Sequence, residues 1–426
     1  MGETMFRWIG MALVLTSVLG QVQLAVADDQ LQTIRDLLQR VHELELKVSQ
    51  LQTEKSAVQA TKDLDPNQNT AAFQEPNQTL SHSEHMDPPS ELTSEERFPS
   101  LHLHGFADAD FSATDQHGSN SGFNMGQFIL QITSPLTSRV AYFGEVSLTA
   151  QPSNYSVDLE RSFIRYELND YLKVSFGRYH TPINYWNTAF HHGLWLQTTI
   201  ARPDMIRFGG RFEPVHFIGF LTEGNIPSGR LGLGYDIGLG NGRGSILSRP
   251  GDTGAANNAR GWVSNIFARP IRGLQFGGSF YGDKITPSPA LPGSPQFREL
   301  ISSAHLVWTK ETPEFLAEFA NVHHRNTLTG AGYDSRAFYV QLGYRLPSLA
   351  HHWKPYYRFE RTEVPWNEPV FAVSDPALAV TNLNGSTLGV RYDFTDFAAF
   401  KMEYRNTKKG SEPSFNGAYF QTSFTF

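Results

Sequence analysis

The C-terminal stretch from Ser414 to Phe426 alternates in polarity with a period of two. In an extended strand this pattern puts Phe420, Phe424 and Phe426 on one face and mainly polar residues such as Gln421 on the other. A soluble sandwich strand can alternate in the same way, but a frayed terminus seldom buries a large aromatic side chain. The final strand of a membrane barrel closes the cylinder and turns one face to lipid. The tail therefore favours a closed transmembrane barrel and is typical of its C-terminal insertion signal.

The same period continues through most of the chain from Leu101 onward. For example, Met402 and Tyr404 alternate with Lys401 and Glu403. Unpaired charges in a soluble core would cost several kcal/mol each, whereas a water-filled interior would hold them at little cost. The polar face is therefore predicted to point inward. The interior charges predicted in this way are Arg161, Arg165, Glu167, Glu318, Arg345, Arg358, Glu360, Arg391, Asp393, Lys401, Glu403 and Arg405.

Turn signals divide this region into eighteen candidate strands. These strands are expected to begin near Leu101, Gly122, Ser138, Ser156, Tyr171, Asp204, Val215, Leu231, Arg243, Gly261, Leu274, Gln296, Pro313, Ser335, Lys354, Ser386, Phe397 and Ser414. The weakest candidate begins at Arg243, and sixteen strands remain if it and the candidate at Leu231 belong to a loop. The predicted fold is thus an all-β, antiparallel transmembrane barrel of 16–18 strands, eighteen by count.

The residues before Leu101 predict three further parts. Residues 1–27 contain one Arg, an apolar run and an Ala-Val-Ala site, which is typical of a signal peptide, with a retained helix as the alternative. Residues 28–55 repeat apolar residues in heptads, which predicts a coiled coil of two or three helices or else a single amphipathic helix. Residues 56–100 are polar and rich in Gln, Asn and Pro, as in a disordered linker. The barrel is then 101–426.

Composition and charge exclude several classes of function. The chain has no Cys, so it has no disulfide, thiolate nucleophile or Cys-bound metal. Mean hydropathy is −0.35, and beyond the first residues no apolar run reaches the roughly 18 residues of a transmembrane helix. The net charge of −7 belongs to residues 28–100, where 14 acidic side chains face 6 basic ones. We expect no enzyme activity, cofactor, metal site or nucleic-acid partner.

The connection after the fifth candidate strand is the most informative loop. It runs from Arg178 to about Arg202 and carries many aromatic and His residues, which a solvent-exposed loop has little reason to hold. One interpretation is a pore constriction. Another is that its aromatic side chains pack against the inner wall or a neighbouring protomer, and both interpretations can hold. The candidate constriction residues are Arg178, His180, Tyr185, Trp186, His191, His192 and Trp195.

The arrangement of the whole chain resembles a family of bacterial outer-membrane channels. A signal peptide, a coiled coil, a polar linker and a barrel that opens with G-F-A-D-A-D (Gly105 to Asp110) and closes on Phe426 are similar to phosphate-selective porins of Gram-negative bacteria, including porins with an N-terminal coiled coil. In trimeric porins the third long loop folds inward and narrows the pore, and the loop from Arg178 is the third long connection. Those porins use interior arginines for anions, but the interior here carries both signs, so phosphate selectivity is not carried over.

This resemblance implies a porin of the outer membrane, a passive diffusion channel for small polar or charged solutes. The partners implied are outer-membrane lipid, the barrel assembly machinery and two further copies in a homotrimer, with the N-terminal stalk in the periplasm. The alternative is a structural or adhesive protein, in which the barrel is only an anchor and the stalk or loops bind a partner.

Overall fold

The computed structural model describes Gln39 and residues 98–190, 193–209, 211–243, 247, 251–254, 257–286, 296–371 and 379–426. The chain divides into two units, Met1–Thr79 and Leu80–Phe426, and only the second is described beyond a single residue. The predicted signal peptide, coiled coil and nearly all of the linker thus lie outside the described residues and stay predictions. Among the residues described, no helix is long and apolar enough to cross a membrane.

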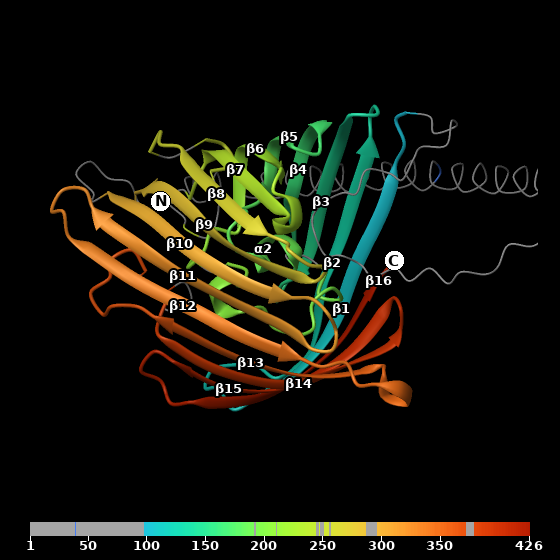
Figure 1. Cartoon of the computed structure of the whole chain (residues 1–426). Helices are drawn as coiled ribbons and strands as arrows, with labels where there is room; N and C mark the ends of the chain where they lie inside the picture. The colour runs from blue at the N-terminus through green and yellow to red at the C-terminus, as the bar shows by residue number, and fades with distance from the viewer. Residues whose placement is uncertain are drawn as a thin grey trace, which may run out of the picture. The chain divides into compact units, whose positions relative to one another are not determined.

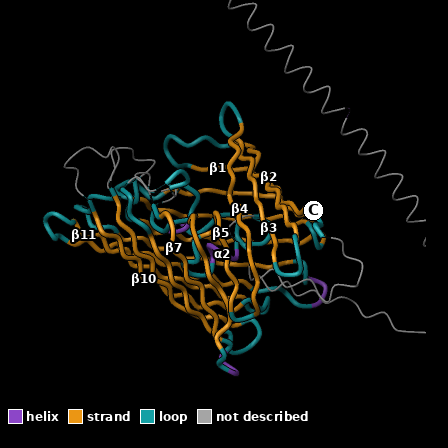
Figure 2. Tube along the Cα trace, turned by 90° about the horizontal axis from the view of Figure 1, so that it is seen from above, coloured by secondary structure: helices purple, strands orange, loops and turns teal. Residues whose placement is uncertain are grey.

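The second unit is a closed barrel of sixteen antiparallel strands (Figures 1 and 2). Each strand pairs with its neighbours in the sequence, and β16 pairs with β1 to close the ring, with Phe420 opposite Phe111. The strands are β1 (His102–Thr114), β2 (Gly122–Pro135), β3 (Val140–Ala150), β4 (Tyr155–Asn169), β5 (Leu172–His180), β6 (His216–Ile226), β7 (Leu233–Asn241), β8 (Gly261–Ala268), β9 (Leu274–Ile285), β10 (Phe297–Trp308), β11 (Glu314–Asn326), β12 (Gly332–Gly343), β13 (Trp353–Glu363), β14 (Leu383–Thr395), β15 (Ala398–Lys409) and β16 (Phe415–Thr425).

The all-β antiparallel class is confirmed, but the count of eighteen strands is wrong. The candidate at Asp204 is a 3₁₀ turn, η1 (Asp204–Ile206), and its first N–H donates to Glu360 Oε2 on the wall at 2.6 Å. The candidate at Arg243 is not among the sixteen strands that close the barrel, and most of its residues lie outside the described ones. The candidate near Leu231 is β7, although the sixteen-strand alternative would have assigned it to a loop. A loop that contacts a polar wall can therefore alternate between polar and apolar residues over a short stretch. The sequence pattern alone does not distinguish such a loop from a strand.

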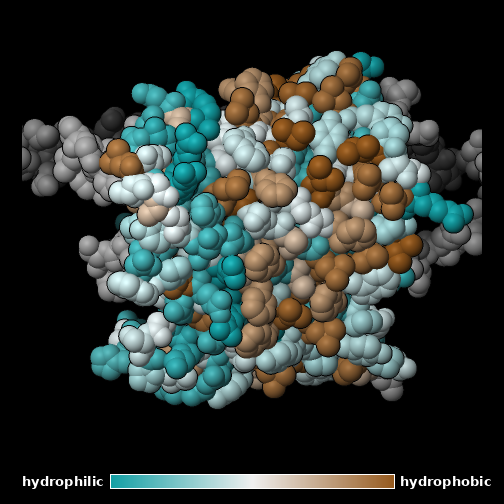
Figure 3. All heavy atoms as spheres, turned by 60° about the vertical axis from the view of Figure 1, so that its left-hand side comes forward, coloured by the Kyte–Doolittle hydropathy of each residue, from teal (hydrophilic) through white to brown (hydrophobic). Residues whose placement is uncertain are grey.

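Alternation along each strand separates an apolar outside from a polar inside. In β15, Met402 and Tyr404 are exposed on the outer surface, whereas Lys401 and Glu403 are buried inside. In β16, Phe424 is exposed on the outside and Gln421 is buried inside. Figure 3 shows a band of hydrophobic side chains on the outer surface, next to a hydrophilic zone. The barrel thus presents an apolar belt outward.

The connections differ between the two rims. At the rim where β1 begins and β16 ends, they are mostly short, as at 170–171 and 396–397. At the opposite rim several are long, and the connection between β5 and β6 spans 181–215. We call these the short-turn rim and the long-loop rim. Short turns on one side and long loops on the other are the pattern of outer-membrane barrels.

Candidate functional site

The connection 181–215, which we call the inward loop, lies inside the ring of strands (Figures 1 and 2). It contains α2 (Trp186–Ala189) and η1. Its buried apolar side chains pack against the inner wall, and Trp186 lies with its ring 4.9 Å from that of Phe190 and 5.7 Å, edge to face, from that of Tyr339. The members that the inward loop contributes to this core are Ile183, Tyr185, Trp186, Phe190, Met205, Ile206 and Phe212. A hydrophobic core therefore forms within a barrel whose wall is polar.

Acidic side chains of the wall accept hydrogen bonds from the backbone of the inward loop. Glu318 on β11 accepts from the N–H groups of Tyr185 and Trp186, at 2.8 and 2.6 Å, through one carboxylate oxygen. Glu403 on β15 accepts from the N–H of Ile200 at 2.6 Å. Because both carboxylates are buried, a missing partner would leave a costly uncompensated charge.

Basic side chains of the wall donate to carbonyl groups of the same loop. The Arg358 guanidinium on β13 donates to the carbonyl of Ala201 at 2.7 Å. Arg391 on β14 donates to the carbonyl of Trp195 at 2.7 Å, and Lys401 on β15 donates to that of Leu194. Hydrogen bonds to charged groups each contribute about 1.5–3 kcal/mol. The wall therefore holds the loop by matching carboxylates to N–H groups and cations to carbonyl groups.

A second set of contacts fixes the far end of the loop. Arg243, after β7, donates to the carbonyls of Arg211 and Phe212 at 2.6 and 2.7 Å. Glu213 is buried and accepts from Asn184 Nδ2 at 2.9 Å, which joins the two ends of the loop. Burial and the nearby Glu318 raise the pKa of Glu213 well above its ordinary value. Glu213 is thus held in its neutral form as the pH passes its usual titration range.

One glycine permits a close approach of the loop to β1. Gly193 has φ +86°, a left-handed conformation that favours glycine. A Cβ atom at this position would lie 2.8 Å from the ring of Phe106, which points inward from β1. Any larger residue would push the loop away from the wall there.

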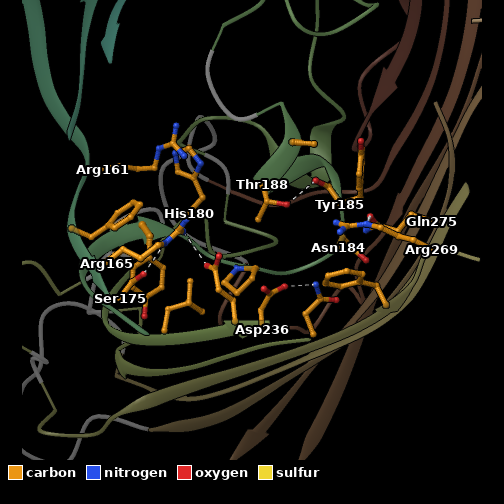
Figure 4. A pocket seen from close by; sticks show the side chains of 18 residues that line it. Arg161, Arg165, Ser175, His180, Asn184, Tyr185, Thr188, Asp236, Arg269 and Gln275 are labelled. Carbon is orange, nitrogen blue, oxygen red and sulfur yellow. Dashed lines mark hydrogen bonds and ion pairs between the residues drawn. The ribbon is translucent and has the colours of Figure 1, made fainter. Parts of the chain in front are cut away.

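Two cavities lie beside the loop, next to different parts of the wall. One, of about 70 Å³, lies against β4 to β9, where Arg161 and Arg165 face Asn184 and Tyr185 of the loop (Figure 4). The other, of about 570 Å³, lies against β1 to β3 and β13 to β16. The larger cavity has acidic Asp108 and Asp110 from β1 and basic Arg202, Arg207 and Arg405 from the loop and β15. Charges of both signs thus line the larger cavity.

The structure places the predicted constriction residues in different settings. Tyr185 and Trp186 are in the buried core, Trp195 lies under the Arg391 guanidinium at 5.7 Å, and His191 and His192 fall outside the described residues. His180 is a buried wall residue whose Nε2 lies 3.6 Å from Glu145 Oε1. Arg178 forms an ion pair with Asp252 of the β7–β8 connection.

The predicted interior charges also divide into groups. Arg358, Glu360, Arg391, Lys401, Glu403 and Glu318 contact the inward loop, as described above. Arg161 pairs with Glu145 at 2.7 Å, Arg165 with Glu223 at 3.1 Å and Glu167 with Lys173 at 3.4 Å. Arg405 pairs with Glu403 and borders the larger cavity. Arg345 lies in the β12–β13 connection at the short-turn rim, where it pairs with Glu311 and Asp393.

Several residues that hold the loop were not identified from the sequence. Glu314 accepts from Thr198 Oγ1 at 2.7 Å, and Glu213 and Arg243 act as described above. The inward position of Glu314 on β11 follows from its spacing of four residues from Glu318, which was the available signal. Nothing local distinguishes Glu213 or Arg243, because their partners are far away in the sequence. Among the described residues, no three His, Asp or Glu side chains are placed to bind a metal ion.

The architecture was compared with solved structures. The anion-selective porin from Comamonas acidovorans superposes with a TM-score of 0.55 at 11% identity, covering 77% of this chain and 100% of that one. OmpT of Vibrio cholerae, an outer membrane protein in its trimer form, gives 0.53 at 12% identity over 77% and 99%. The outer membrane channel DcaP of Acinetobacter baumannii gives 0.52 at 11% identity over 77% and 97%. The barrel has the porin fold. No family model and no curated protein matches the sequence.

Proposed function

We propose that this protein is an outer-membrane porin that lets small polar or charged solutes diffuse passively across the membrane. The observation that carries the proposal is the inward loop, which charged wall groups hold inside a closed, polar-lined barrel. Such a loop narrows the interior of a wide barrel and leaves the ring of strands intact. The porin fold of outer-membrane channels from other bacteria supports the same conclusion.

The charges of the larger cavity bear on the class of solute. Asp108 and Asp110 on one side and Arg202, Arg207 and Arg405 on the other offer contacts to both cations and anions. We therefore infer a mixed-charge passage with weak selectivity. A trimer, cleavage of residues 1–27 and a periplasmic stalk belong to the same proposal, and the trimer form of OmpT supports the first of these.

Planar-bilayer recording of the purified full-length protein tests this function. Folded protein should give steady, ohmic conductance steps, whereas protein boiled before addition should give none. Heat-dependent gel mobility would establish beforehand that the barrel is closed. Complete absence of conductance from folded protein would contradict the channel and favour a barrel that acts only as an anchor.

A further inference from the structure

Three cations form a row on the outer surface of the barrel, at the long-loop rim. Arg298 on β10 points outward, because its neighbours Phe297 and Glu299 are buried inside. The strand register puts it directly opposite Lys284 on β9 and Arg325 on β11. Neighbouring strands lie about 4.8 Å apart, so the row spans roughly 10 Å. Arg298 and Arg325 are exposed and Lys284 is half-buried.

The ion pairs of the described residues give this cationic row no counter-charge. Within the described part of the chain, no ion pair is formed by any of its three members, while the nearby Asp334 on β12 pairs with His323 at 3.0 Å. Residues 287–295, which join β9 to β10, contain no Asp or Glu in the sequence. Like charges directly opposite each other on neighbouring strands are destabilising. The row therefore gains stability from an external anion.

An apolar surface begins immediately below the row, toward the middle of the barrel. Leu300 is the next outward residue of β10, about 7 Å along the strand, and it is 43% exposed. On β9, Phe280 is 52% exposed, and Trp262 of β8 lies over Gly282, between Phe280 and Lys284. Aromatic side chains mark the level of the membrane interface in outer-membrane barrels. The row thus lies where a lipid headgroup would meet its acyl chains.

We propose that Lys284, Arg298 and Arg325 bind the phosphorylated headgroup of a membrane lipid, whose acyl chains lie on Trp262, Phe280 and Leu300. The guanidinium forks of two arginines match phosphate oxygens. The long-loop rim of such barrels faces the outside of the cell, so the lipid belongs to the outer leaflet. The inference rests on the membrane location proposed above but not on conduction.

Native mass spectrometry of the full-length protein in mild detergent tests the site. The probe is an acylated glucosamine disaccharide with two phosphates, compared with the same lipid without phosphates and with inorganic phosphate. The double variant R298Q/R325Q should bind the phosphorylated lipid about tenfold more weakly or worse. The matched control R230Q/R272Q removes two exposed arginines from the short-turn rim and should bind as the wild type does.

Further outcomes separate the lipid from other occupants. L300Q should weaken lipid binding while leaving barrel closure unchanged, as judged by heat-dependent gel mobility. Equal binding by the double variant, equal binding of the lipid without phosphates, or full competition by inorganic phosphate would each overturn the proposal. A loss of oligomer mass in the double variant would instead make the row an interface between copies. Conductance of the double variant should match the wild type, so a failed lipid site leaves the channel proposal standing.

Discussion

At the scale of single residues, Glu318 is the wall group with the clearest role in holding the inward loop. One of its oxygens accepts the backbone N–H groups of Tyr185 and Trp186, which precede and begin α2, and no side chain of the loop is needed for either bond. The turn therefore binds the Glu318 carboxylate through backbone N–H groups, as backbone turns bind free anions. These bonds give a carboxylate among buried aromatic groups its hydrogen-bond partners.

Replacement of Glu318 by Ala should release this end of the loop. Two buried N–H donors would lose their acceptor, at a cost of about 1–3 kcal/mol each. We expect E318A to give noisier single-channel currents and faster proteolytic cleavage within the loop. The control is E363A, which removes an exposed carboxylate from β13. Traces and cleavage rates equal to the wild type in E318A would show that Glu318 does not fix the loop.

Glu213 gives a prediction about pH. Its pKa is raised in the folded protein by burial and by Glu318, so its neutral form stabilises the loop. This contribution is complete below the ordinary pKa of 4.5 and is lost as the pH rises through the folded value. Current noise should therefore increase toward alkaline pH. E213Q stays neutral and can still accept from Asn184, so its noise should not follow pH; an unchanged profile in E213Q would refute the assignment.

At the scale of elements, the connection between β13 and β14 is held to the wall by one histidine and contacts the inward loop through Phe371. His324 on β11 has each ring nitrogen 2.8 Å from a carboxylate oxygen, Glu299 on one side and Glu368 on the other. Only the charged imidazolium can donate to both. Phe371, three residues after Glu368, stacks on Phe212 of the inward loop with ring centres 5.7 Å apart. The β13–β14 connection and the inward loop thus stabilise each other at the long-loop rim.

Loss of His324 should therefore open the β13–β14 connection. In H324F both donors disappear, leaving Glu299 and Glu368 close together without the imidazolium between them. Limited proteolysis should cut residues 364–371 several times faster than in the wild type. H323F is the matched control, since His323 is adjacent in sequence but faces outward toward Asp334. Equal cleavage of the two variants would remove the role assigned to His324.

The elements themselves were largely predictable, whereas the contacts of the loop were not. Period-two alternation identified the strands and their inward faces, because each strand carries its own pattern. Asp204 was wrongly assigned to a strand, since its partner Glu360 lies far away in the sequence and leaves no local mark. The interior charges were expected to face water, yet Arg358 and Lys401 donate to loop carbonyls. Only the folded loop shows that these charges have protein partners.

At the scale of the whole molecule, the proposed trimer gives the remaining prediction. Ile34, Leu37, Val41, Leu44, Val48 and Leu51 form a heptad seam that a single helix cannot bury. Polar replacement of Leu37 and Leu44 together should weaken the oligomer while each barrel stays closed, because burial of one such side chain contributes about 1.5–3 kcal/mol. Mass measurement in mild detergent decides this. A strictly monomeric wild type would contradict the trimer, and a trimer that survives the double replacement would assign its contacts to the barrel.

The wall holds the inward loop mainly through the backbone N–H and C=O groups of the loop. Every amino acid except proline has both groups. Substitutions along residues 194–204 could therefore change the size or charge of the side chains next to the larger cavity without removing the bonds from Arg358, Arg391 and Glu403. Sequence variation at these positions can therefore alter permeability while the hydrogen bonds that hold the loop remain. Proline at Ile200 is a clear exception, since it would eliminate the N–H that Glu403 accepts.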